Sequence, residues 1–231
     1  MRLAQKKRLA GWERLHAEQI KSLERVRGLA EVYTHEREVN AMLDLVPGMF
    51  PSAADPGNTD CTFFEPACGH GNFLVEILRR KLEYVIPRRY GRGERFEHRV
   101  LRCLTSVYGI DINHDNVRDS RERSRAVIAA HVERHLGVDG AAAGFGEAVE
   151  AVLRANVICA DTLAEAAEIE LIEYRPGRGC TFTRRWSRLD SYAGALSLLP
   201  LDRCDKFPVH YLELSSNPGP VLAEAIEMEA A

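Results

Sequence analysis

The feature that most constrains the fold is a strand, a turn of small residues and a helix that follow one another directly. Residues 61–65, CTFFE, form an apolar run of strand length, and residues 66–71, PACGHG, are rich in small residues. Residues 72–82, NFLVEILRRKL, carry apolar side chains at helical spacing. This order predicts one strand–helix unit of a parallel α/β sheet.

The same alternation recurs twice along the chain. Residues 106–110, SVYGI, end at Asp111 and are followed by a helical pattern over 114–136. Residues 156–160, NVICA, end at Asp161. Short apolar strands that alternate with helices predict an α/β fold, a Rossmann-like parallel sheet with helices on both faces.

The regions that flank this sheet have different patterns. Apolar residues at a spacing of three and four predict an amphipathic N-terminal helix over residues 1–30. A second helix is expected over 36–46, with Thr34 as its cap. We therefore expect an α/β domain over 31–168, followed by a divergent region, 169–231, that begins with a β-hairpin.

Composition excludes several other classes of protein. The chain has 231 residues, of which 45% are hydrophobic and 28% charged, which is typical of a globular domain with a sizeable core. The longest uncharged run has only 11 residues, and the N-terminus has no apolar stretch of the kind found in signal peptides. These features predict a cytoplasmic protein that does not contact a membrane.

Cysteine and histidine spacing argues against a metal site. The six cysteines include no CxxC pair, so free thiols are expected and a zinc site is not. His131 and His135 are four residues apart in HVERH, but the glutamate does not directly follow the first histidine, as a zinc-protease helix requires. We expect these two histidines to be exposed residues of a helix.

The formal net charge of −3 conceals strong local imbalances. Residues 1–30 carry +5, residues 79–102 carry +6, and residues 147–173 carry −6. Basic segments suit phosphate backbones, although solvated helix faces have the same composition. The Arg-rich stretch 79–102 is expected to form helix ends around a loop.

Residues with ligand-binding chemistry follow each predicted strand. Gly69 and Gly71 permit a close backbone approach, and Asn72 begins a helix whose first N–H groups are free. Asp111 at the second strand end suits the hydroxyl groups of a ribose. Asp161, followed by Thr162, can accept from an exocyclic amine or cap the next helix. Because parallel strands gather their carboxyl ends at one edge, these features predict a pocket for an adenosine-containing ligand.

The turn itself discriminates between adenosine ligands. A dinucleotide site favours GxGxxG, but the sequence has Gly69-His70-Gly71 without a third glycine, and no GK[ST] of a P-loop occurs. S-adenosylmethionine carries no phosphate and does not need the tighter phosphate-binding turn. The spacing therefore favours this cofactor.

Four segments together resemble the N6-adenine DNA methyltransferases of restriction–modification systems. EPACGHGNFLVEIL at 65–78 is similar to their motif I, and EVYTHEREVNAMLDLV at 31–46 resembles motif X, with His35 in place of the usual proline. YGIDI at 108–112 resembles motif II, and ICADTL at 158–163 resembles motif III. Motif X standing before motif I matches the order of the γ-type group.

The resemblance assigns roles to individual residues. It implies that residues of motif I line the methionine part of the cofactor, that Asp111 holds the ribose hydroxyls, and that Ile112 packs on the adenine. Asp161 would accept from the adenine amine, and Tyr33 and Thr34 would close a lid. The full set of implied cofactor-binding residues is Tyr33, Thr34, Glu65, Pro66, Ala67, Gly69, Gly71, Asn72, Phe73, Asp111, Ile112, Asp161 and Thr162.

The catalytic motif of that family is missing. It consists of Asn or Asp, two prolines and an aromatic residue, which together hold a flipped adenine. The nearest string here is SNPGP, and the only catalytic candidates it offers are Asn217 and Pro218. A turn is the alternative interpretation of this string.

Several functions stay open from the sequence. The first is an S-adenosylmethionine-binding adenine-specific DNA methyltransferase domain or subunit, which would need a partner subunit or second copy to supply DNA recognition. The second is a catalytically inactive methyltransferase-like subunit of a restriction or defence complex. A methyltransferase acting on RNA or a small molecule, and an α/β domain without a nucleotide ligand, are further alternatives.

Overall fold

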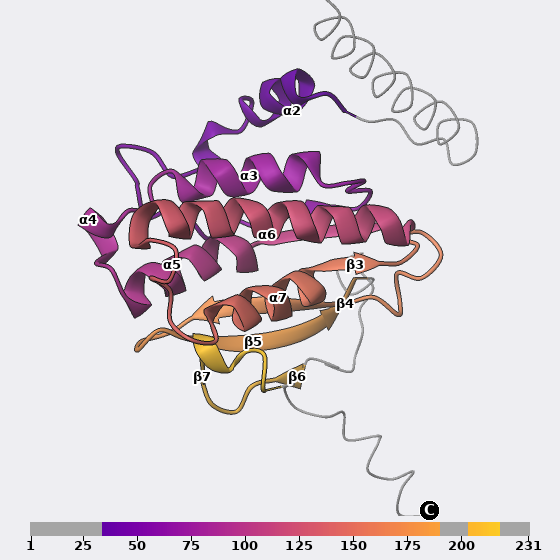
Figure 1. The fold of residues 1–231 in the computed structure, drawn as a ribbon. Coiled ribbons are helices and arrows are strands. Elements are labelled where there is room, and N and C mark those ends of the chain that lie inside the picture. The colour runs from indigo at the N-terminus through magenta and orange to yellow at the C-terminus, as the bar shows by residue number, and fades with distance from the viewer. Residues whose placement is uncertain (1–33, 190–202, 218–231) are drawn as a thin grey trace, which may run out of the picture. The chain divides into compact units, whose positions relative to one another are not determined.

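A computed structural model describes residues 34–189 and 203–217, and three parallel strands organise most of this region (Figure 1). The strands are β1 (Phe63–Glu65), β2 (Val107–Asp111) and β3 (Val157–Cys159), in the spatial order β1-β2-β3. Their register aligns Glu65 with Gly109, and Asp111 with Cys159. The predicted parallel sheet is therefore present, with each strand within two residues of its expected bounds.

Helices connect the strands. Two of them, α3 (Asn72–Leu82) and α6 (His114–Leu136), have the bounds that the sequence predicts. The remaining helices are α2 (Glu36–Leu43), the single 3₁₀ turn η1 (Pro47–Met49), α4 (Pro87–Tyr90), α5 (Glu94–Thr105) and α7 (Phe145–Asn156). None of the described helices is long and apolar enough to cross a bilayer.

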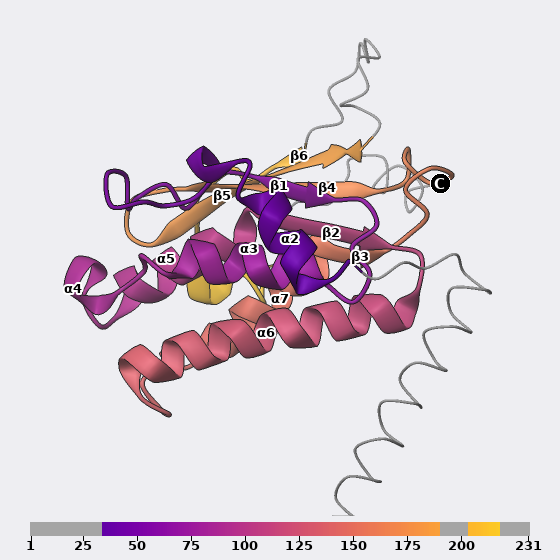
Figure 2. The same ribbon diagram turned by 90° about the horizontal axis from the view of Figure 1, so that it is seen from above.

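The crossover helices lie on one side of the strands rather than on both (Figure 2). The strand order advances in one direction from β1 to β3, and right-handed crossovers then place every connecting helix on the same face. A Cβ atom at Gly109 would lie 2.6 Å from Leu74 of α3, so this residue of β2 faces the helices. Tyr108, its neighbour on the opposite face, donates from its hydroxyl to the Ile172 carbonyl at 2.7 Å. In the described residues, the expectation of helices on both faces is therefore corrected.

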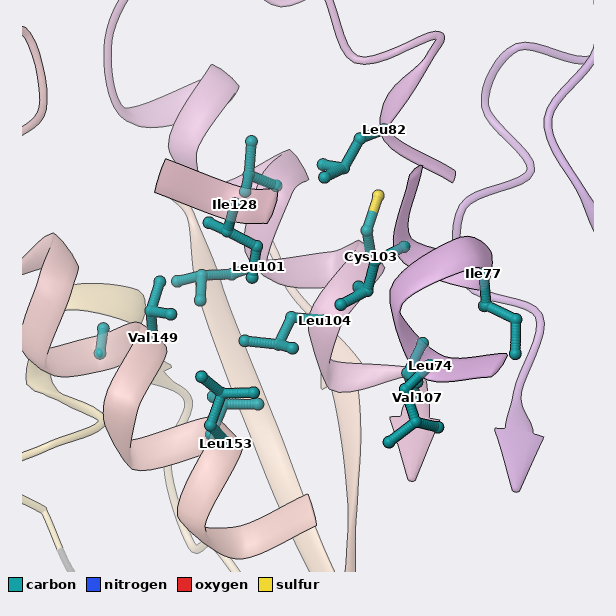
Figure 3. Close-up of a cluster of buried hydrophobic side chains, with 14 of the residues drawn as sticks. Leu74, Ile77, Leu82, Leu101, Cys103, Leu104, Val107, Ile128, Val149 and Leu153 are labelled. Atoms are coloured by element: carbon teal, nitrogen blue, oxygen red, sulfur yellow. The ribbon is translucent and has the colours of Figure 1, made fainter. Parts of the chain in front are cut away.

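In the described residues, an apolar core lies between the parallel strands and the helices (Figure 3). Side chains from β2, α3, α5, α6 and α7 meet there, and most of them are almost fully buried. Burial of apolar area on this scale stabilises a domain by about 25 cal/mol for each Å² removed from water. The core includes Leu74, Ile77, Leu82, Leu101, Cys103, Leu104, Val107, Ile128, Val149 and Leu153.

The Arg-rich stretch 79–102 is more helical than expected. Gly91, which has a φ of 78°, ends α4, and α5 then runs for 12 residues from Glu94. Phe96, Val100 and Leu101 are completely buried on one face of α5. The expected loop is thus confined to residues 83–86 and 91–93. On α5, Arg95 is exposed, whereas the half-buried Arg99 and Arg102 donate to Thr59 and Asp60.

The chain after β3 forms the predicted hairpin. Strands β4 (Glu170–Pro176) and β5 (Thr181–Arg188) pair antiparallel over seven residues. Two short strands that the sequence did not reveal, β6 (Arg203–Cys204) and β7 (Val209–His210), also pair with β5, and the 3₁₀ turn η3 (Tyr211–Glu213) follows. The hairpin is therefore the centre of a second, antiparallel sheet.

Buried polar contacts fix residues 203–217 in place. The Arg184 guanidinium in β5 donates to both carboxylate oxygens of Asp205, at 2.9 and 3.0 Å, and both side chains are about 95% buried. The Tyr211 hydroxyl donates to the buried Glu97 carboxylate of α5 at 2.6 Å. Burial and this carboxylate both raise the pKa of Tyr211. These contacts join the antiparallel sheet to the helix layer.

The chain divides into two compact units, Met1–His35 and Glu36–Ala231. The predicted amphipathic helix over 1–30 lies outside the described residues. The hairpin region and the parallel sheet belong to the same unit, and α2 ends at Leu43, three residues before the expected end of that helix.

Candidate functional site

The glycine turn after β1 packs closely against α6. Gly69 and Gly71 both have positive φ, 53° and 87°, in the region that favours glycine. A Cβ atom at Gly71 would lie 2.5 Å from the Ser120 hydroxyl of α6, whereas one at Gly69 would meet nothing within 4 Å. Gly71 is therefore required by packing, and Gly69 leaves open space beside the turn.

Asp111 joins this turn to the end of β2. Its Oδ2 accepts from the Gly69 backbone N–H at 2.9 Å. Its Oδ1 accepts from the Asn113 backbone N–H at 2.9 Å and from the Asn116 side-chain amide at 3.1 Å. A carboxylate has about four acceptor positions, so these bonds leave one of them on Oδ2 for a ligand hydroxyl.

The third strand end contacts the first. The Thr162 hydroxyl donates to the Pro66 carbonyl at 2.9 Å, which joins the segment after β3 to the glycine turn. Asp161 Oδ1 accepts from the backbone N–H groups of Leu163 and Ala164 at 2.9 and 3.0 Å. The sequence left two roles open for Asp161, which are capping the next turn and recognising an adenine amine. In the structure, Oδ1 performs the capping role.

Arg123 of α6 holds the turn from a second direction, which the sequence did not reveal. Its guanidinium donates to the His70 carbonyl at 2.7 Å and to the Asn72 side-chain oxygen at 2.9 Å. Burial lowers the pKa of Arg123, and the nearby Arg79 lowers it further. Arg123 and Ser120 lie on adjacent turns of α6. Both contact the glycine turn, so this helix fixes the position of the turn.

Exposed apolar side chains surround this edge of the sheet. Ile112 is 65% exposed directly after β2, and Leu163 is 95% exposed after β3. Phe64 in β1 is 40% exposed. Large exposed apolar residues next to convergent polar groups are typical of a binding surface for a flat, partly apolar ligand. Phe73, by contrast, packs against the core.

Burial raises the pKa of two ionisable groups of motif I. Burial raises the pKa of the Glu65 carboxyl, which has a long contact of 3.4 Å with the Ala67 N–H. Burial raises the pKa of the Cys68 thiol to about 12, and the charge of Asp111 adds to this effect. Cys68 is therefore a protonated packing residue at neutral pH and not a nucleophile.

The remaining predicted site residues are Tyr33, Thr34, Asn217 and Pro218. Tyr33 and Pro218 lie outside the described residues, and Thr34 belongs to the first unit. The Asn217 carbonyl and side-chain oxygens accept from Arg184 at 2.6 and 2.9 Å. Asn217 therefore has a structural contact, and the structure gives no support to a catalytic role for it.

The histidine and cysteine side chains of the described residues are dispersed. No group of three or more His, Cys, Asp or Glu side chains that could hold a metal ion occurs among them. All six cysteines are free thiols, as predicted. His131 is buried rather than exposed, and its Nε2 lies 2.8 Å from the Val85 carbonyl, which corrects the expected exposure.

Comparison of the chain with protein-family models, curated proteins and solved structures gives no match. The fold is an α/β fold with a three-stranded parallel sheet, which is compatible with a Rossmann-like architecture.

Proposed function

We propose that the chain is an S-adenosylmethionine-binding domain or subunit of an adenine-specific DNA methyltransferase, and that its activity depends on a partner. One observation carries this proposal: Asp111 and Thr162 each bond the glycine turn, so the segments that resemble motifs I, II and III converge at one edge of the sheet. Motif similarity scattered over the domain would not support the proposal.

The residues at this edge fit the chemistry of the cofactor. The free acceptor position on Asp111 Oδ2 suits one ribose hydroxyl, and a second hydroxyl would have to replace the Gly69 N–H. The exposed Ile112 and Leu163 side chains offer apolar surface to an adenine ring. The open space beside Gly69 admits a ligand close to the backbone.

The protein residues would bind and orient, while S-adenosylmethionine, when bound, supplies a methyl group on a positively charged sulfonium. The half-buried Glu65 carboxyl lies at the start of the turn, where a carboxylate attracts a cationic amine or sulfonium. Arg123 and Asp111 hold the turn in one conformation before any ligand arrives. A preformed site loses less conformational entropy on binding.

The absence of the family's catalytic motif from the sequence is the reason for proposing a partner and also for the second candidate function. The sequence contains no Asn/Asp-Pro-Pro-aromatic tetrad, and Asn217 is held by Arg184. A partner or second copy would supply the residues that hold the target adenine. The alternative is a catalytically inactive methyltransferase-like subunit that binds the cofactor and regulates a restriction or defence complex.

Calorimetric titration with S-adenosylmethionine tests the proposal. Ile112→Asn should weaken binding at least 10-fold, because it places an amide where an apolar face should meet the adenine ring. Val138→Asn is the matched control, since Val138 is 81% exposed in the loop before α7, and it should leave affinity unchanged. No heat of binding for the unmodified chain, at concentrations up to the millimolar range, would overturn the proposal.

A methylation assay separates the two candidates. Transfer of labelled methyl groups to DNA, observed only when a partner is added, supports the partner-dependent enzyme. Cofactor binding without transfer to DNA under any combination supports the regulatory subunit.

A further inference from the structure

Exposed arginines gather at the end of the domain opposite the proposed cofactor site. They come from α4, from the connection to α5 and its first turn, and from the last turn of α6. Figures 1 and 2 both show α4 and the end of α6 at the same end of the domain, away from the carboxyl edge of the parallel strands. We call these residues the arginine cluster, which consists of Arg88, Arg89, Arg92, Arg95 and Arg134.

Contacts with buried side chains hold the segments of the arginine cluster against α6. The Val85 carbonyl, just before α4, lies 2.8 Å from Nε2 of the buried His131. The ring centroids of Phe96 in α5 and His135 in α6 are 5.9 Å apart. Both ends of residues 85–96 are therefore fixed on α6, and the arginines between them belong to an ordered surface.

The charges of the arginine cluster are not neutralised within the described part of the protein. In residues 34–189 and 203–217, none of the five side chains has a hydrogen bond or an ion pair. Other exposed arginines of α6 differ, because Arg118 is paired with Asp115 at 2.7 Å. Residues 88–95 hold four arginines and one glutamate, so this segment carries +3. Burial lowers the pKa of His135, and the charges of Arg134 and Arg92 lower it further, so two segments contribute positive charge around one histidine.

This surface suits phosphate groups better than an acidic protein. A guanidinium can donate two parallel hydrogen bonds to one phosphate. Protein interfaces, by contrast, have an apolar centre, and among the large exposed apolar side chains of the described residues only Val138 lies next to these segments. The whole chain has a formal net charge of −3, so it has no general attraction for a polyanion and any binding must come from a local surface.

The aromatic residue within the arginine cluster is not available for stacking on bases. The Tyr90 ring of α4 packs against the core, and the Arg99 guanidinium lies 4.8 Å from its centroid. Its hydroxyl donates to the Pro56 carbonyl at 3.5 Å. Single-stranded nucleic acids are held by aromatic side chains that stack on their bases, whereas a duplex presents phosphates on its outside. The cluster therefore favours a duplex over a single strand.

We propose that the arginine cluster binds the phosphate backbone of duplex DNA. The choice of DNA over duplex RNA rests on the proposed function, and the electrostatic contact itself does not. Because the cluster and the glycine turn lie at opposite ends of the parallel strands, this contact is separate from the one that would present an adenine to the cofactor. It would hold the duplex outside the target base pair and would not select a sequence.

Fluorescence anisotropy with a labelled DNA duplex of mixed sequence tests the proposal without cofactor or partner. Arg92→Glu and Arg134→Glu should each weaken binding about tenfold. Arg188→Glu is the charge-matched control, since Arg188 is exposed and aligns with Glu170 at the end of the hairpin opposite its turn, and it should leave the affinity unchanged. Thermal unfolding of each variant confirms that it is folded.

The salt dependence of binding gives a second measurement. A variant with Gln at all five positions of the arginine cluster should lose most of the dependence of affinity on salt, because each phosphate contact contributes about 0.9 to the slope of log affinity against log salt. Binding that persists unchanged in this variant would place the contact elsewhere, for example on residues 1–30, and would overturn the proposal.

Three other results would also overturn it. The first is no binding of duplex DNA by the unmodified chain at low salt. The second is an equal loss for Arg92→Glu and Arg188→Glu, which would report net charge and not this surface. The third is tighter binding of duplex RNA or single-stranded DNA than of duplex DNA. Because no cofactor is present in these measurements, each result is independent of the calorimetric test of S-adenosylmethionine binding.

Discussion

The backbone N–H of Gly69 donates to Asp111 Oδ2 at 2.9 Å, which joins the turn after β1 to the end of β2 across 42 residues of sequence. The bond places a carboxylate beside a backbone that only glycine can adopt without strain. Asp111 therefore orders the turn, and its remaining acceptor position faces the proposed cofactor site.

Asp111→Asn should destabilise the fold by about 1–3 kcal/mol, because the new NH₂ group faces backbone N–H donors and leaves buried groups unpaired. Urea denaturation measures this change. Asp115→Asn, at an exposed position of the first turn of α6, is the control and should change stability by a few tenths of that amount. Equal effects of the two variants would show that the bonds to Asp111 do not stabilise the turn.

Gly71→Ala should be more destabilising than Gly69→Ala. Both variants place a side chain at positive φ, which costs roughly 1–2 kcal/mol. Only the Gly71 variant also forces a Cβ atom to within 2.5 Å of the Ser120 hydroxyl. Thermal unfolding should show this difference, and Ser120→Gly in the Gly71→Ala background should recover part of the loss. A double variant no more stable than Gly71→Ala would contradict the packing argument.

Arg123→Met should loosen the glycine turn while the rest of the domain stays folded. The variant removes two bonds to the turn, at the His70 carbonyl and the Asn72 side chain. Amide hydrogen exchange of residues 69–73 should accelerate by about tenfold, which corresponds to about 1.4 kcal/mol for a lost hydrogen bond. Arg125→Met, on the same helix and paired with Glu150, should leave that exchange unchanged.

The contribution of Lys81 to stability should increase with pH above about 8. This buried ammonium donates to the Thr59 and Cys61 carbonyls and to the Ser106 hydroxyl, and no carboxylate within residues 34–189 and 203–217 pairs with it. Burial lowers its pKa from 10.5 to about 8, so between these values the unfolded chain binds more protons than the folded chain. The free energy of unfolding then rises by up to about 1.4 kcal/mol per pH unit in that window.

The comparison of the unmodified chain with Lys81→Met isolates this effect, because other groups titrate in both. The stability difference should be constant from pH 6 to 7 and shift in favour of the unmodified chain from pH 8 to 10. A difference that stays flat up to pH 10 would mean that Lys81 keeps its proton in the folded state.

Local patterns predicted much of the fold. The bounds of α3 and α6 agree with the sequence because apolar periodicity and helix-end residues mark them. The second half of the Arg-rich stretch was wrongly predicted, because its many arginines obscured the buried face of α5. The one-sided helix layer follows from strand order, which no local pattern reports.

The residues of the candidate site also fall into those that the sequence predicted and those that it did not. Gly69, Gly71 and Asp111 were found because they stand at strand ends, where a motif is read from consecutive residues. Arg123 and Ser120 were missed because each acts through a contact across about 50 residues, on a helix with no conspicuous motif at those positions. Asn217 was a candidate catalytic residue only because of the local string SNPGP. Its contact with Arg184 of β5 forms through the second sheet, which the string does not reveal.

The buried pair of Arg184 and Asp205 has a consequence for synthesis. The arginine in β5 leaves the ribosome 21 residues before its carboxylate, so for that interval the hairpin holds a cation that it cannot bury without cost. A nascent chain halted between the two positions could complete the three parallel strands but not the second sheet. Completion of the second sheet is thereby coupled to the synthesis of the segment that carries Asp205.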